Sequence, residues 1–262
     1  MDIGCSTSCF YPIETEKAFD EVIKLGFKKA EIFFNTSSEL ELPFVNELKR
    51  MADCNGVRVL SAHPFSSALE NMCIFGEYER RYEDFIGLYQ KHCHAAAVLG
   101  AEFVVIHGAL DRRKIPLDDG LYFERFKKLV EIGKAEGVSV CQENVNKFKS
   151  QHIDFMKRMR KALGSDFKMV FDIKQAVRAG YDPFEFLEEM KNEIVHVHIS
   201  DNKLPESDCM PPGRGNFDFS CLFDTLDNAG YKGGYVIEIY SRGLDVKREL
   251  ELSKRYFDEF GR

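Results

Sequence analysis

The 262-residue chain has no tryptophan, no pair of cysteines in CxxC spacing and no long uninterrupted apolar run. Because a membrane-spanning helix needs about 18 or more apolar residues, no such helix is expected. Eight cysteines without CxxC spacing do not predict a thiolate zinc site. The first ten residues have neither a basic segment nor an apolar stretch, so no secretory signal is expected. The predicted location is the cytoplasm, where the cysteines would be reduced thiols.

Long basic runs are also missing. Asp and Glu number 43 against 36 Lys and Arg, which gives a net charge of −7. The Lys/Arg runs are no longer than Arg112-Arg113-Lys114. Because an acidic chain repels phosphate backbones, no nucleic-acid partner is expected.

Short segments rich in Val, Ile and Phe alternate with amphipathic ones along the whole chain. Enrichment in Val, Ile and Phe is typical of β-strands. The expected strands are Asp2–Ser8, Lys29–Phe34, Arg58–Pro64, Phe103–Gly108, Ser139–Asn144, Lys168–Ile173, Val195–Ser200 and Tyr235–Tyr240. The expected helices are Thr15–Leu25, Leu42–Asn55, Tyr78–Leu99, Leu117–Glu136, Gln151–Ala162, Pro183–Met190, Phe219–Asn228 and Asp245–Phe260.

This alternation predicts parallel strands joined by helical crossovers. Several expected helices are followed by a glycine, as at Gly56, Gly100 and Gly137, which fits helix ends in the left-handed conformation. Eight such units favour a closed α/β barrel, a (β/α)8 TIM barrel, over an open sheet. No GxGxxG motif follows the first strand, which argues against a dinucleotide-binding fold. No linker is visible, so residues 1–262 are predicted to form a single domain.

Ionisable residues stand at the ends of the last four expected strands. Successive side chains of a strand alternate between its two faces, and the apolar set should face the helices. The other set then points into the barrel mouth and contains Glu143, Asp172, His198 and Glu238. Three carboxylates gathered there would repel one another unless a cation compensated them. The pattern therefore predicts one divalent metal ion, and three carboxylates with one imidazole suit Mn²⁺, Mg²⁺ or Zn²⁺.

Each of the other polar residues near the strand ends has two interpretations, one in substrate binding and one structural. His63 and His107 either contact substrate or are hydrogen-bonded rim histidines, and their place at the carboxyl ends of strands favours substrate. Gln175 either reaches a sugar hydroxyl or starts the next helix. Arg214, in a glycine-containing loop, either binds a carboxylate or phosphate or belongs to a plain turn. His196, one layer deeper than His198, is expected to be structural.

Five segments of the chain carry a resemblance to a known family. They are Gln142-Glu143-Asn144, Val170 to Ala176, His196 to Asp201, Pro212 to Phe219, and Glu238 with the two residues before it. Together they resemble the xylose isomerase-like barrel superfamily, in its sugar phosphate isomerase/epimerase branch. The resemblance covers essentially the whole chain. It implies that Glu143, Asp172, His198 and Glu238 bind the metal.

The resemblance also implies the reaction, an isomerisation or epimerisation of a small sugar or polyol derivative. Glu143 and Glu238 would act as acid and base on opposite faces of the substrate, through an enediolate formed next to a polarised carbonyl. Two positions depart from the family pattern: Gln175 stands where many members have His, and Arg214 stands where Glu is usual. The second departure favours an acidic or phosphorylated substrate.

Alternative functions remain open at this point. A lyase of the same fold, dehydrating an inosose or a dehydroshikimate-type ring, would use the same metal and the same proton abstraction. A non-catalytic barrel that binds a metabolite is a third class. The endonuclease branch needs further histidines after the seventh strand, and residues Asn202 to Phe219 contain none. Homodimers are common in such barrels, although the sequence indicates no interface.

Overall fold

Eight parallel strands close into a barrel in the computed structural model, which describes residues 3–111, 118–240 and 243–260. Asp2, Leu117 and the Arg112-Arg113-Lys114 run lie outside the described residues. The strands follow one another around the barrel as β1 (Gly4–Ser6), β2 (Lys29–Phe33), β3 (Arg58–His63), β4 (Phe103–Ile106), β5 (Ser139–Glu143), β6 (Met169–Asp172), β7 (Ile194–Ile199) and β10 (Gly234–Ile237). Parallel pairing of β10 with β1 closes the ring.

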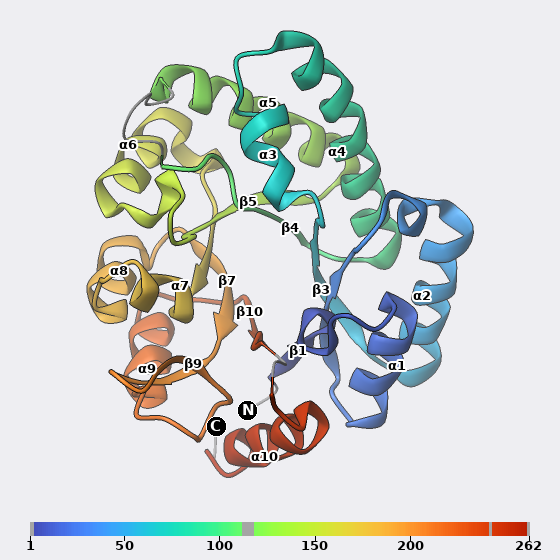
Figure 1. Ribbon diagram of the computed structural model, residues 1–262, viewed down its shortest axis with the longest axis vertical. Coiled ribbons are helices and arrows are strands. Elements are labelled where there is room, and N and C mark those ends of the chain that lie inside the picture. Colours follow the sequence, from blue (N-terminus) through green and yellow to red (C-terminus); the bar gives the residue numbers. More distant parts are fainter. Residues whose placement is uncertain (1–2, 112–117, 241–242, 261–262) are drawn as a thin grey trace.

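Helices surround this barrel, as Figure 1 shows. They are α1 (Thr15–Lys24), α2 (Leu42–Asn55), α3 (Ser67–Cys73), α4 (Glu79–Leu99), α5 (Asp119–Glu136), α6 (Ile153–Leu163), α7 (Ile173–Arg178), α8 (Pro183–Met190), α9 (Phe219–Asn228) and α10 (Val246–Asp258). The glycines that end α2, α4 and α5 have φ of 60°, 78° and 79°, as expected for left-handed caps. The predicted (β/α)8 TIM-barrel fold is therefore confirmed.

Two strands and two α-helices were not expected from the sequence. A two-stranded antiparallel sheet of β8 (Asp201–Lys203) and β9 (Ser207–Met210) lies where a plain loop was predicted. The other two are short helices: α7 directly follows β6, and α3 begins shortly after β3. Such short elements contain too few residues to show a hydrophobic period, so tertiary contacts decide their conformation.

Apolar side chains form two layers, and the strand alternation determines which layer each joins. Phe171, Val197 and Ile237 belong to the large core between the strands and the helices. Cys141 and Val170 belong to a smaller cluster inside the barrel, on the opposite faces of their strands. The inner cluster lies below the ionisable residues that end the strands, and these residues meet at the carboxyl end of the barrel. Active sites of this fold lie at that end.

Candidate metal centre and substrate cavity

Four ionisable side chains converge at the carboxyl end of the barrel. Glu143 ends β5, Asp172 ends β6, His198 lies on β7, and Glu238 directly follows β10. The His198 Nδ1 atom lies 3.3 Å from Glu238 Oε2, 3.6 Å from Asp172 Oδ2 and 3.8 Å from Glu143 Oε1. One ligand atom from each residue lies within 4.8 Å of the others. This spacing allows all four to contact one cation.

The local sequence fixes the orientation of Asp172. Asn144, one residue after β5, bonds both backbone groups of Asp172: its amide donates to the carbonyl at 3.0 Å, and its oxygen accepts from the N–H at 2.7 Å. The Asp172 Oδ1 atom accepts from the backbone N–H of Gln175 and so caps α7. Asp172 Oδ2 is thereby the oxygen that faces His198. Asp172 thus ends β6, caps α7 and directs one carboxylate oxygen toward His198.

The electrostatic state of the group is what a cation site requires. Burial would raise the pKa of Glu143, but the charges and hydrogen bonds of neighbouring histidines, His107 foremost, hold it well below its usual range. Burial opposes ionisation of Glu238 as well, yet Lys174 and His198 lower its pKa. Burial raises the pKa of Asp172, with Lys174 opposing it. The neighbouring cationic groups thus favour the ionised forms of Glu143 and Glu238, and carboxylate charge gathered in one place needs a compensating cation.

One unpaired atom indicates where the cation would bind. Among the described residues, none supplies a hydrogen-bond partner to His198 Nδ1, although the ring is buried. Burial would lower the pKa of His198, but Glu31 and Glu238 raise it well above its usual value, so a metal ion would take the place of a proton on this ring. Imidazole nitrogen and carboxylate oxygen together suit Mn²⁺, Mg²⁺ or Zn²⁺. The residues present fit such a metal ion, with His198 Nδ1 and one oxygen each from Glu143, Asp172 and Glu238 as donors.

Glu31, on β2, lies behind His198 and was missed by the sequence analysis. It is fully buried and accepts hydrogen bonds from His198 Nε2 at 3.0 Å, Ser61 Oγ at 2.7 Å and Ser6 Oγ at 3.0 Å. Because Nε2–H donates to Glu31, Nδ1 is the nitrogen available to a metal ion. The inward parity of β2, in which Lys29, Glu31 and Phe33 share a face, would have indicated this residue.

His196, expected to be structural, lies below His198 and has no contact with the substrate cavity described below. Its Nε2 atom is 3.1 Å from Ser61 Oγ and 3.5 Å from Glu31 Oε2. Because the single hydroxyl hydrogen of Ser61 goes to Glu31, the imidazole Nε2–H of His196 donates to the hydroxyl oxygen. Burial lowers the pKa of His196. The ring therefore packs as a neutral member of the hydrogen-bond network under the site.

Lys174, in the first turn of α7, was also missed. Its side chain is only 2% exposed, and its ammonium bonds Asp172 Oδ2 and Glu238 Oε2. Burial would lower the pKa of Lys174, but the surrounding carboxylates, Asp172 first, raise it well above its usual value. A cationic ammonium thus stands among the anionic donors.

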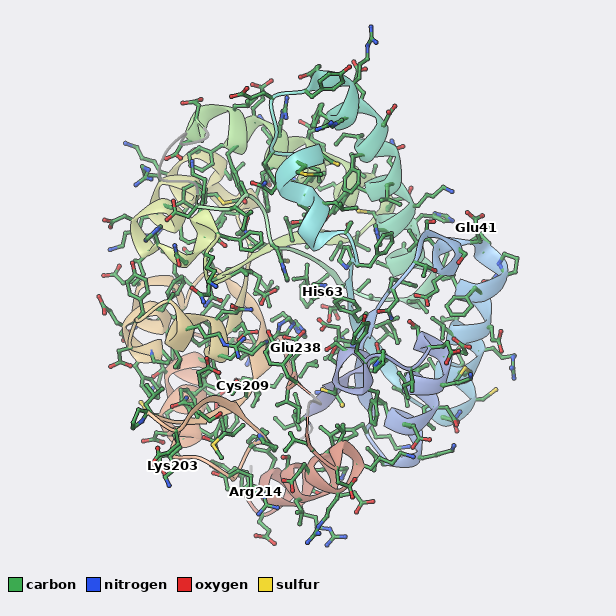
Figure 2. The ribbon with its side chains drawn as sticks, viewed as in Figure 1. Glu41, His63, Lys203, Cys209, Arg214 and Glu238 are labelled. Carbon is green, nitrogen blue, oxygen red and sulfur yellow. The ribbon has the colours of Figure 1, made fainter. Side chains whose placement is uncertain are left out.

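A cavity of about 310 Å³ opens beside this group. Three of the residues expected to contact substrate line it, namely His63, His107 and Gln175. His107 Nε2 lies 3.0 Å from Glu143 Oε2 and 3.0 Å from His63 Nε2. Figure 2 shows His63 and Glu238 at the centre of the barrel. The remaining walls are Ser8, Tyr11, Phe33, Glu143, Lys174, Glu238, Ile239 and Tyr240.

Arg214 is not brought to this cavity. Its side chain is 44% exposed and forms an ion pair with Glu249 of α10, with Nε 2.8 Å from the carboxylate, and Figure 2 shows it at the edge of the molecule. The glycine loop is held instead by Asp201. Its carboxylate accepts from the backbone N–H groups of Gly213 at 3.0 Å and Gly215 at 2.8 Å. Gly215 is required there, because a Cβ would lie 2.2 Å from the carbonyl oxygen of Asn202.

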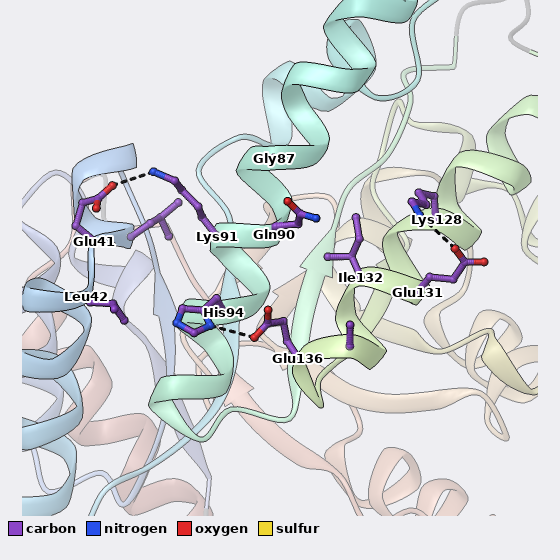
Figure 3. A pocket seen from close by; sticks show the side chains of 12 residues that line it. Glu41, Leu42, Gly87, Gln90, Lys91, His94, Lys128, Glu131, Ile132 and Glu136 are labelled. Carbon is purple, nitrogen blue, oxygen red and sulfur yellow. Dashed lines mark hydrogen bonds and ion pairs between the residues drawn. The ribbon is translucent and has the colours of Figure 1, made fainter.

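A second cavity, of about 650 Å³, lies on the outer surface between α2, α4 and α5. Figure 3 shows its charged side chains pairing with one another, Glu41 with Lys91 and His94 with Glu136. These pairs are exposed, and exposed pairs contribute little energy. Among the described residues that line this outer cavity, no buried ionisable groups converge as they do at the barrel mouth. No helix among the described residues is long and apolar enough to cross a membrane.

Comparison with known proteins was consistent with this geometry. The sequence pattern of the family described as "Xylose isomerase-like TIM barrel" matches residues 19–256. An inosose dehydratase of Clostridium beijerinckii is 24% identical, over 85% of this chain and 81% of its own. Among solved structures, 3-keto-D-glucoside 4-epimerase from E. coli superposes with a TM-score of 0.80 at 20% identity, covering 99% of both chains. A D-tagatose 3-epimerase-like protein gives 0.82 at 23% identity, covering 100% of this chain and 98% of its own. At these identities the structural likeness establishes the fold.

Proposed function

The chain belongs to the xylose isomerase-like TIM-barrel family, and from that membership and its site we propose that it is a divalent-metal-dependent isomerase or epimerase of a small sugar or polyol derivative. The observation that carries this proposal is the buried group of Glu143, Asp172, His198 and Glu238, whose donor atoms lie within 4.8 Å of one another. Sugar epimerases among the structural neighbours support the same reaction class.

The metal ion would be held by His198 Nδ1 and the three carboxylates. When bound, a divalent ion polarises a carbonyl group and so makes the neighbouring C–H more acidic. The cavity beside the donors, at about 310 Å³, is at the small end of the range for ligand pockets, about 300–1,000 Å³. It therefore favours a substrate the size of a monosaccharide.

Glu143 and Glu238 are the proposed acid–base pair. They come from β5 and from the end of β10, and β6 and β7 separate them in the barrel order. Both line the cavity, and in the proposed reaction the sugar lies between them with one carboxylate toward each face. One glutamate takes the proton from the carbon next to the carbonyl, which gives an enediolate. The other returns a proton, either to the opposite face of that carbon or to its neighbour.

The neighbours of each glutamate prepare it for proton transfer. His107 lies 3.0 Å from Glu143 Oε2, and the carboxylate, opposing the effect of burial, raises the pKa of this histidine. Ser8 Oγ lies 3.4 Å from Glu238 Oε1. The glutamate that takes the proton acts in its ionised form, and the one that returns a proton must be protonated at that stage. His63 and Gln175 at the cavity wall are proposed to bind the substrate hydroxyls.

The test is incubation of the protein with Mn²⁺ and a panel of ketoses, aldoses and inososes in deuterated water. Deuterium should enter at the carbon next to the carbonyl, detected by mass spectrometry and NMR. Glu143→Gln and Glu238→Gln should each abolish this exchange. Glu41→Gln, the same substitution at a residue whose side chain is 60% exposed on the outer surface, should retain it. Wild-type exchange in either cavity variant would show that its glutamate is not an acid–base group.

A dehydratase is the second candidate, favoured by the inosose dehydratase relative. Elimination of water begins with the same proton abstraction, so the same residues would serve it. The products distinguish the two reactions, because a dehydratase releases water and forms an ultraviolet-absorbing enone. A barrel that only binds a metabolite would cause no deuterium exchange at all.

A further inference from the structure

The ammonium of Lys174 and the expected metal ion make use of the same oxygen atoms. Asp172 Oδ2 and Glu238 Oε2 are the carboxylate oxygens nearest His198 Nδ1, at 3.6 Å and 3.3 Å. The same two atoms accept hydrogen bonds from Lys174 Nζ. The ammonium is therefore located within the donor group rather than at its rim.

The position of the lysine in the chain explains how its ammonium reaches the donors. Lys174 lies two residues after Asp172, in the first turn of the helix that Asp172 caps. Its side chain is 2% exposed, so bulk water solvates the charge little and the carboxylates compensate it. A buried cation of this kind remains only where anions surround it.

A metal ion held by these side chains would compete with this ammonium for the same two oxygen atoms. A divalent ion binds carboxylate oxygen at roughly 2.0–2.2 Å and would approach the two atoms that Lys174 Nζ now contacts. Two cations sharing two oxygen atoms would also repel each other, and burial strengthens this repulsion relative to bulk water. The ring of Tyr240, whose centroid lies 5.7 Å from Nζ at the cavity wall, is an aromatic face that a displaced ammonium can contact.

We propose that Lys174 is an internal cation of the site, which neutralises Asp172 and Glu238 in the metal-free protein and which a divalent metal ion must displace in order to bind. The inference rests on the metal centre of the proposed function. It assigns to Lys174 a role opposite to that of a ligand: the residue weakens metal binding and stabilises the metal-free barrel. Removing its charge should therefore strengthen binding, whereas removing a ligand weakens it.

The experiment measures the dissociation constants of Mn²⁺ and Co²⁺ from the metal-stripped full chain by isothermal titration calorimetry, without any substrate. Lys174→Met keeps the length of the side chain and removes its charge, and it should tighten both constants by at least about tenfold, which corresponds to about 1.4 kcal/mol. Lys174→Arg retains a cation and should not tighten binding. Lys17→Met, at a residue whose side chain is 63% exposed on α1, controls for the change in net charge.

Thermal unfolding in the presence of a chelator is the second measurement. Lys174→Met should unfold at a lower temperature than the wild type without metal, because two carboxylates lose their counter-charge, and added Mn²⁺ should abolish the difference. An affinity that is unchanged or weaker in Lys174→Met would overturn the inference. So would a loss of thermal stability that Mn²⁺ does not repair, because Lys174 would then be an ordinary structural ion pair.

The two proposals can fail separately. If Lys174→Met binds Mn²⁺ and the wild type binds none at millimolar concentration, the lysine is the resident cation of the site. The inference then holds, and the metal dependence of the proposed function is wrong. If neither protein binds metal, the metal centre is wrong and the inference fails with it.

Discussion

Replacement of Glu31 by Gln tests whether the residue behind His198 controls the metal site. Glu31 accepts the Nε2–H of His198 at 3.0 Å and is buried with two serine hydroxyls that donate to the same carboxylate. Burial would raise the pKa of Glu31, but the charge of His198 and the neighbouring hydrogen bonds lower it well below its usual range. The group is therefore an anion that makes the imidazole a better electron donor and fixes its tautomer.

The expected magnitude follows from the kind of hydrogen bond. A bond to a charged group contributes about 1.5–3 kcal/mol and a neutral one about 0.5–1.5 kcal/mol. Glu31→Gln keeps the shape and a neutral bond, so the loss is about 1–2 kcal/mol. At about 1.4 kcal/mol per tenfold, this weakens metal binding roughly 5- to 30-fold.

Calorimetric titration of the metal-free protein with Mn²⁺ provides the assay, after thermal unfolding has shown that the variant is folded. Glu70→Gln is the matched control, because Glu70 is also fully buried and bonds the backbone N–H of Gly108 without touching any of the four donors. The control should bind Mn²⁺ within about twofold of the wild type. If Glu31→Gln did so too, Glu31 would have no influence on the metal and the reasoning would be refuted.

Three further predictions concern acid stability, a tight backbone position and the substrate cavity. Burial lowers the pKa of His92 to about 3. The same imidazole takes up a proton near pH 6.5 in the unfolded chain, so the free energy of unfolding should fall as the pH drops from 6.5 to 3. The loss should be about 2 kcal/mol by pH 5, at about 1.36 kcal/mol per pH unit. Urea unfolding at pH 7 and pH 5 would measure it, and His92→Phe should be less acid-sensitive; equal sensitivity would exclude His92 as the cause. Gly108→Ala should lower the unfolding temperature, because φ is +91° and the new Cβ would lie 2.0 Å from Tyr122 Oη; an unchanged melting curve would contradict the packing described. His107→Gln should raise the KM for the sugar while Mn²⁺ affinity stays within about threefold of the wild type; a larger loss of affinity would place His107 among the metal ligands.

The alternation of side chains along strands was enough to predict that Glu143, Asp172, His198 and Glu238 converge. Met169 and Phe171 on β6 join the outer core, so Val170 and Asp172 had to face inward. The same rule, applied to β2, would have indicated Glu31. A lone Glu between Ala30 and Ile32 has no partner in the sequence, however, and only the closed barrel brings it to His198.

The alternation of side chains along strands could not predict the directions of two other side chains. Lys174 follows the end of β6, where the chain turns into α7 and the parity of the strand no longer applies. Its direction depends on which carboxylates lie across the barrel, 64 residues away in the case of Glu238. Arg214 follows the β8–β9 hairpin, which was not expected, and its contact with Glu249 spans 35 residues. The sequence left open whether this glycine-containing loop binds a ligand or forms a plain turn, whereas the direction of its arginine depends on the packing of α10.

Crystals of the full chain soaked in Mn²⁺ would test the central claim most directly, through an anomalous difference map. The account predicts one strong peak at the carboxyl end of the barrel, roughly 2.0–2.3 Å from His198 Nδ1 and from an oxygen of Glu143, Asp172 and Glu238. Lys174 should have left these oxygens in the same crystals. A map with no peak among the four side chains, or with manganese bound only elsewhere on the barrel, would contradict it.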